Sequence, residues 1–182
     1  MTNAADTSSA RRPVRRWTAT ATAVALAATG LSSTSTTAFA AVDESAPVVI
    51  AEVYGGGGNS GGLFDRDFVE LANVSADTVD LSGWSVQYAS ATGSTWQVTE
   101  LGDLSLPAGE RLLVGQAYGN DRTLPSFDPD VDGSIALSGT QGKVALVDST
   151  TALTGATGLV TLDQVVDFVG WGAATHFAGS AV

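Results

Sequence analysis

The chain has 182 residues, of which 44% are hydrophobic, and its 19 acidic and 8 basic side chains give a formal net charge of −11. This length allows one domain with a substantial hydrophobic core and is short for two. Because the sequence contains no cysteine, it excludes a disulfide framework, thiolate metal sites and a cysteine nucleophile.

Residues 1–40 have the pattern of a secretory signal peptide. The basic start RRPVRR (residues 11–16) precedes a short apolar run, and residues 38–40 form an A-x-A cleavage site. The apolar run is about 15 residues long and contains several threonines, so it falls short of the roughly 20 apolar residues that cross a bilayer. The sequence therefore predicts cleavage after Ala40, secretion, and a mature chain with no membrane span.

Removal of this leader makes the protein more acidic. The leader carries four arginines and one aspartate, so residues 41–182 keep 18 acidic and 4 basic side chains, a net charge of −14. Nucleic-acid binding draws most of its affinity from Lys and Arg side chains that neutralise phosphates. The charge balance therefore disfavours direct binding of nucleic acid unless divalent cations bridge the two, and an acidic surface is in keeping with a soluble secreted protein.

After a polar lead-in at residues 41–47, short segments with β-type alternation recur, each followed by glycine, proline or asparagine. In the segment WSVQY, Trp84, Val86 and Tyr88 share one face, whereas Ser85 and Gln87 share the other. The expected strands are residues 48–54, 68–72, 84–88, 96–99, 111–116, 134–137, 143–147 and 165–170.

The spacing of these strands predicts an all-β fold. No segment keeps apolar residues at helical spacing for long enough to indicate a helix of any size. Two-layer antiparallel packing is typical of such a pattern, so we expect a β-sandwich or barrel. The residues expected in its core are Phe68, Trp84, Trp96 and Phe168.

The first expected strand runs directly into YGGGGNSGG, residues 54–62. A phosphate-binding loop would need a lysine after the glycines and a helix behind it, but the segment that follows, LFDRDFVEL, reads as a strand. The glycines therefore favour a wide, flexible connection between two strands, in which Asn59 can adopt a positive φ.

The segment DPDVDG, residues 128–133, has carboxylates at the first, third and fifth positions of a calcium loop. The twelfth position, where an EF-hand has a bidentate glutamate, is Gly139. A solvated acidic turn is the favoured interpretation. The alternative is weak calcium binding by Asp128, Asp130 and Asp132, and no other metal or cofactor is expected.

The sequence offers no catalytic constellation. Glu52 and Glu70 lie within expected strands, where a hydrogen bond to backbone or turn residues is favoured over a paired-carboxylate site. His176 is the single histidine, and no G-x-S-x-G elbow accompanies it, so it is expected to be a loop residue.

Several segments together resemble the lamin tail domain family as it occurs in secreted bacterial proteins. They are VVIAEVYGGGGNSGG, DFVELANVSADTVDLSGWSVQYAS, LPAGERLLVG, DGSIALSGTQGKVALVD and VVDFVGWG, between Val48 and Gly172. The most specific part is Glu70, Asn73 and the turn LSGW at residues 81–84. The resemblance implies an immunoglobulin-like β-sandwich over residues 48–182 and a glycine run that connects strands within it.

The family resemblance also implies a non-catalytic accessory or binding role toward an extracellular or cell-envelope ligand. One alternative is the N-terminal accessory part of a secreted endonuclease/exonuclease/phosphatase-type hydrolase, and another is a calcium-stabilised adhesion module. Family members usually continue after VVDFVGWG through a turn and a further strand. Because this sequence stops at Val182, it suggests a truncated sandwich without its last strand.

Overall fold

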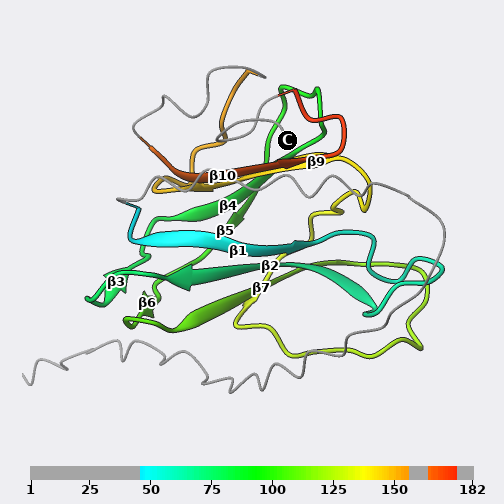
Figure 1. The fold of residues 1–182 in the computed structure, drawn as a ribbon, viewed down its shortest axis with the longest axis horizontal. Helices are drawn as coiled ribbons and strands as arrows, with labels where there is room; N and C mark the ends of the chain where they lie inside the picture. The colour runs from blue at the N-terminus through cyan, green and yellow to red at the C-terminus, as the bar shows by residue number, and fades with distance from the viewer. Residues whose placement is uncertain (1–45, 156–163, 176–182) are drawn as a thin grey trace, which may run out of the picture.

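The computed structural model describes residues 46–155 and 164–175. The expected signal peptide, most of the lead-in and His176 lie outside these ranges. The described chain forms two sheets of four strands each, packed face to face as two layers (Figure 1). Because every element in the described ranges is a strand, the prediction of an all-β, immunoglobulin-like sandwich is confirmed.

The first sheet has the order β1-β2-β7-β8, with β1 at Val48–Tyr54, β2 at Arg66–Asn73, β7 at Arg111–Tyr118 and β8 at Val131–Asp132. The second has the order β10-β9-β4-β5, with β10 at Val165–Trp171, β9 at Gly142–Val147, β4 at Ser85–Ala89 and β5 at Gln97–Glu100. A third, two-stranded sheet joins β3 (Val79–Asp80) to β6 (Ser105–Leu106). Pairing is antiparallel apart from the short parallel pair β7–β8. Among these elements there is no helix long and apolar enough to cross a bilayer.

The interior between the two sheets is mostly aliphatic. Alternate residues of β2 and β7 point inward, so that Val69 and Leu71 meet Leu112 and Val114, all of them fully buried. Val86 of β4 faces them from the second sheet. This interior follows the period of two that the sequence shows.

Three of the four expected core aromatics are buried, but outside this interior. Trp96 and Phe168 pack together, with ring centroids 6.1 Å apart, in a separate cluster on the outer face of the second sheet. Phe68 is also buried on an outer face, that of the first sheet. Trp84 is partly buried against the main interior. Phe68, Trp96 and Phe168 therefore cover the outer faces, whereas Tyr88 is the buried aromatic residue of the main interior.

The second face of β4 is buried as well. Gln87 is fully buried; its Nε2 donates to the carbonyl of Thr151 at 3.0 Å, and the Leu153 N–H donates to its Oε1 at 2.8 Å. The neighbouring Ser85 hydroxyl donates to the carbonyl of Ser149. These bonds fasten the segment after β9 across the outer face of the second sheet.

The predicted strand at residues 134–137 is wrong. Two of its backbone N–H groups donate to side chains instead of a neighbouring strand: Ile135 N donates to Gln116 Oε1 at 3.1 Å and Leu137 N to Asp67 Oδ2 at 2.7 Å. The two large apolar side chains of the segment, Ile135 and Leu137, are still buried. Side-chain acceptors therefore replace part of the ladder that strand pairing would have supplied, and the Ile135 carbonyl keeps one backbone bond, from the Ala117 N–H at 2.9 Å.

At one edge of the sandwich, β1 and β10 lie side by side. The carboxylate of Asp167, in β10, accepts the Ile50 N–H of β1 at 2.6 Å and the Phe168 N–H at 2.8 Å. Burial raises the pKa of Asp167, and the two N–H donors partly offset that rise. This carboxylate joins the edge strands of the two sheets.

Candidate functional site

A group of buried polar side chains lies at the end of the first sheet where β2 begins. Asp65, Arg66 and Asp67 are consecutive, and only 3%, 1% and 4% of their respective surfaces are exposed. The connection after β1 and the segment that follows β7, residues 119–130, lie at this end (Figure 1). Three buried charged residues in succession need partners, because an unpaired buried charge is strongly unfavourable.

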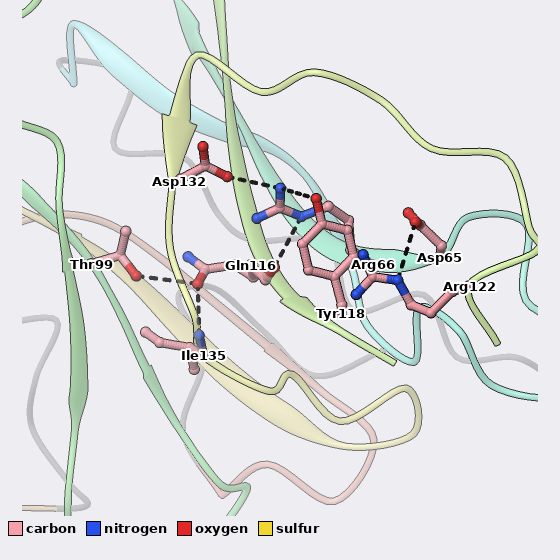
Figure 2. A network of polar contacts seen from close by, with 8 residues as sticks. All are labelled: Asp65, Arg66, Thr99, Gln116, Tyr118, Arg122, Asp132 and Ile135. Atoms are coloured by element: carbon pink, nitrogen blue, oxygen red, sulfur yellow. Dashed lines mark hydrogen bonds and ion pairs between the residues drawn. The ribbon is translucent and has the colours of Figure 1, made fainter. Parts of the chain in front are cut away.

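Arg66 is held by three acceptors. Its Nε donates to the carbonyl of Gln116 at 3.0 Å, and its Nη1 donates to Asp132 Oδ1 at 2.8 Å and to the Tyr118 hydroxyl at 3.2 Å (Figure 2). The Asp132 side chain is 77% exposed, so the ion pair joins a buried guanidinium to a carboxylate at the surface. The pair fixes β8 against β2 across β7.

The ring of Tyr118 lies between two guanidinium groups. Arg66 Cζ is 4.3 Å from the ring centroid and Arg122 Cζ is 3.5 Å from it. Arg122 Nε also lies 3.7 Å from Asp65 Oδ2, as Figure 2 shows. Tyr118 is 44% exposed and the Arg122 side chain 56% exposed, so one end of this stack meets solvent. Cation–π contact and the ion pair together fix the direction of the Arg122 side chain.

Two buried polar atoms at this end have no hydrogen-bond partner among the described residues. They are Asp65 Oδ1 and Gln116 Nε2. The opposite atom of the Gln116 amide, Oε1, accepts from Thr99 Oγ1 at 3.2 Å and from Ile135 N (Figure 2). Such atoms are uncommon in folded proteins, and one of them, Asp65 Oδ1, belongs to the carboxylate that faces the exposed guanidinium of Arg122.

Asp67 ties two segments to the sheet. Its Oδ1 accepts the Gly57 N–H at 2.6 Å and its Oδ2 accepts the Leu137 N–H at 2.7 Å. Burial raises the pKa of the Asp67 carboxyl, and these backbone N–H bonds partly offset the rise. Asp67 thereby fastens the glycine connection to the segment that was wrongly predicted as a strand.

The glycine run connects β1 to β2, as predicted, but it is closely packed rather than wide. A Cβ at Gly57 would overlap the backbone carbonyl of Arg66, and one at Gly58 would lie 2.6 Å from the Cα of Gly119. No non-glycine residue in the described ranges has a positive φ, so the expectation for Asn59 is wrong. The glycines serve close backbone approach, with positive φ at Gly58 and two other positions of the run.

An aromatic cluster covers the outer face of the first sheet beside this network. The rings of Tyr54 and Phe68 stack with centroids 5.2 Å apart, and Phe127 from the segment after β7 meets Phe64 edge-on at 5.6 Å. Arg66 Cζ lies 5.8 Å from the Phe127 ring, so the cluster and the guanidinium network are continuous. Both loops are therefore packed down on the sheet.

The architecture and the sequence agree with one family. The family model of the Lamin Tail Domain matches residues 41–173. The chain belongs to the lamin tail domain family. A search of curated proteins found no match. The family is one of non-catalytic, immunoglobulin-like domains, and its match covers both sheets and the polar network of this lamin tail domain.

The three candidate calcium ligands of the lamin tail domain do not form a metal cluster. No group of three or more His, Cys, Asp or Glu side chains in the described residues is placed to hold a metal ion. Asp130 Oδ2 accepts the Leu113 N–H at 2.9 Å, and Asp132 binds Arg66. Weak calcium binding by these residues and Asp128 stays a prediction that only a binding measurement tests.

Glu70 does not have the backbone or turn partner that the sequence predicted, because its carboxylate accepts a hydrogen bond from the Arg111 guanidinium. Glu52 is paired directly opposite Glu70 across β1 and β2. Like charges in this position repel, and Arg111 compensates one of them on the outer face of the sheet.

The sequence prediction missed the network of Asp65, Arg66 and Asp67. Its signal is the segment LFDRDFVEL, in which three consecutive charged residues stand at the start of a strand with apolar neighbours. Charges at a buried strand entry indicate paired polar groups. The sequence does not indicate their partners, because Arg66 binds groups 50 or more positions away and Asp67 joins Gly57, ten positions away, to Leu137, 70 positions away.

Proposed function

We propose that this lamin tail domain is a secreted, non-catalytic binding or accessory module whose ligand is extracellular or part of a cell envelope. The observation that carries the proposal is that the loops at one end of the first sheet are fixed by buried polar groups and by the aromatic cluster. Loops held on a rigid scaffold are where immunoglobulin-like sandwiches commonly bind.

Three side chains at this end are available to a ligand. Leu63, in the connection after β1, is 70% exposed, and Tyr118 is 44% exposed. Arg122 adds an exposed guanidinium. An apolar, an aromatic and a cationic group on immobilised backbone suit recognition, because little conformational entropy is lost on binding.

The charge of the mature chain argues against nucleic acid as the ligand. With a net charge of −14 for residues 41–182, the cations required to neutralise phosphates are too few. We expect no measurable affinity for a fluorescent DNA duplex in chelator at physiological salt. Tight, salt-sensitive binding under these conditions would contradict this argument.

Secretion is tested by the intact mass of the protein recovered from the medium of its source. A species that matches Ala41–Val182 supports cleavage after Ala40 and a secreted module. A product retained in the cell with its leader contradicts secretion. A much heavier secreted species redirects the search toward an attached hydrolase.

Binding is tested by cosedimentation of purified residues 41–182 with an envelope preparation from the same source. The matched variants are Leu63→Ser at the proposed binding end and Val74→Ser at the opposite end of β2, where Val74 is 61% exposed. We expect Leu63→Ser to weaken binding several-fold and Val74→Ser to leave it unchanged. Absence of wild-type binding, or equal effects of both variants, contradicts the proposal.

A further inference from the structure

We propose that Arg122, held on the ring of Tyr118, is a recognition site for a single carboxylate group on an otherwise uncharged ligand. The inference rests on the proposed binding function and names the chemical group that its exposed end takes. Arg122 would contact the ligand directly, whereas Tyr118 and Asp65 position it.

The guanidinium of Arg122 has a fixed orientation. Its Cζ lies 3.5 Å from the Tyr118 ring centroid, and its Nε faces Asp65 Oδ2 at 3.7 Å. Asp65 is itself immobile, because it is buried, its N–H donates to Pro125 O at 3.1 Å and its carbonyl accepts the Gly119 N–H at 2.9 Å. An arginine held by a ring and a buried carboxylate loses little rotamer freedom when a ligand binds.

The terminal nitrogens of Arg122 retain their hydrogen-bonding capacity. In the described part of the chain, the Tyr118 ring and the Nε contact with Asp65 are the interactions that Arg122 makes. Each terminal nitrogen carries two N–H donors in a planar fork, which matches the two oxygens of a carboxylate. The side chain is 56% exposed, so a ligand has access to this fork.

The other described cations differ from Arg122. Arg66 is buried and bound to Asp132, and Lys143 is fully buried. Arg111 is as exposed as Arg122, with 60% of its side chain accessible, but its guanidinium is bound to Glu70. Of these four side chains, Arg122 is the one that is exposed and whose carboxylate partner contacts only its Nε side.

The surrounding charge selects a ligand with one negative group. The mature chain carries 18 acidic side chains, and Asp121 precedes Arg122 directly. Hydrogen bonds from the Thr123 hydroxyl and N–H hold the pKa of Asp121 below its ordinary value, so this neighbour stays ionised. A polyanion would bring further charges into this negative field, whereas one carboxylate needs only the fork.

The test follows the Nε–Hε resonances of the arginines by NMR in residues 41–182. The probes are glucuronate and N-acetylalanine, which carry one carboxylate on a sugar and on a peptide-like scaffold. Glucose is the uncharged control, and inorganic phosphate is the alternative oxyanion. The resonance of Arg122 is assigned by its loss in Arg122→Gln.

We expect a saturable shift of the Arg122 resonance with at least one carboxylate probe and none with glucose. Arg122→Gln should weaken binding about tenfold, as removal of a charge-assisted bidentate pair does. Arg122→Lys should recover little of this loss, because it keeps the charge but not the planar fork. Arg111→Gln is the matched control and should leave the affinity unchanged.

Four results of these titrations would overturn the inference. They are a response to phosphate alone, equal shifts with glucose, full recovery by Arg122→Lys, and an equal loss in Arg111→Gln. The stronger of the two carboxylate probes identifies a sugar or a peptide-like source. Envelope binding that survives Arg122→Gln overturns the carboxylate site and leaves the proposed function standing. A carboxylate response without envelope binding supports the carboxylate site and contradicts the proposed function.

Discussion

Two regions of this lamin tail domain are equally buried and are stabilised by different physics. Between the sheets, residues such as Leu71 and Leu112 pack as aliphatic side chains with no directional demand. At the entry to β2, Arg66 and Asp67 are as buried, but each is held by specific hydrogen bonds to distant segments. Burial alone therefore does not indicate how a position tolerates substitution; the kind of partner does.

Substitution by methionine provides the sharpest separation of the two regions. Arg66→Met keeps an unbranched chain but leaves the carbonyl of Gln116 and the hydroxyl of Tyr118 without their donor, so we expect a loss of about 3 kcal/mol in unfolding free energy. Leu71→Met nearly conserves volume in an apolar site and should cost about 1 kcal/mol. Urea unfolding measures both, and equal losses would contradict the comparison.

A second prediction distinguishes glycines that pack from glycines that only turn. Gly57→Ala should cost about 2 to 3 kcal/mol, because its Cβ would overlap the backbone of Arg66. Gly61→Ala meets no atom within 4 Å and has only the strain of a φ of 82°, so about 1 kcal/mol is expected. Thermal unfolding measures both losses. Similar losses in the two variants would show that the connection is not tightly packed.

A third prediction concerns pH. Burial raises the pKa of Asp67 and of Asp167 above the ordinary 3.8, so the folded state binds protons more tightly than the unfolded state. Between 3.8 and the raised pKa, each group therefore lowers the unfolding free energy as pH rises, by up to about 1.4 kcal/mol per pH unit.

Asp67→Asn and Asp167→Asn each remove one titrating group. In urea unfolding at a series of pH values, the stability difference between wild type and either variant should shift in favour of the variant as pH rises through this window. Asp121→Asn is the control at an exposed carboxylate whose pKa is lowered, and its difference should shift in favour of wild type as pH rises from that lowered pKa to 3.8. A stability difference between wild type and variant that stays the same at every pH would show that Asp67 or Asp167 does not have a raised pKa.

The smallest effect is expected from calcium. Binding by Asp132 competes with its ion pair to Arg66, so we expect millimolar calcium to stabilise the chain by no more than about 0.5 kcal/mol, as for a ligand near its Kd. A melting curve in calcium and then in chelator measures this, with Asp128→Asn as the variant that spares the ion pair. A large shift would show that the acidic turn rearranges into a metal site.

The aliphatic interior and the polar network also differ in how far the sequence could predict them. The strands over Val48–Tyr54 and around Val86 could be predicted because an apolar, β-branched run and a period-two alternation are both local information. The segment at residues 134–137 has that alternation too, yet Gln116 and Asp67 take its N–H groups, and these partners are remote in sequence. The stack of Arg66, Tyr118 and Arg122 could not be predicted because it depends on the pairing of β2 with β7, which sets Arg66 opposite Tyr118, and on the path of the segment after β7.

The carboxylate of Asp167 has a consequence for association between molecules. A β-sandwich presents edge strands whose free N–H and C=O groups can pair with another chain. At Ile50, the N–H that would make such a pair on β1 is already bound inside the molecule. One side chain thus closes part of the seam between the two sheets, as continuous hydrogen bonding does in a closed barrel, and removes a starting point for strand-by-strand aggregation.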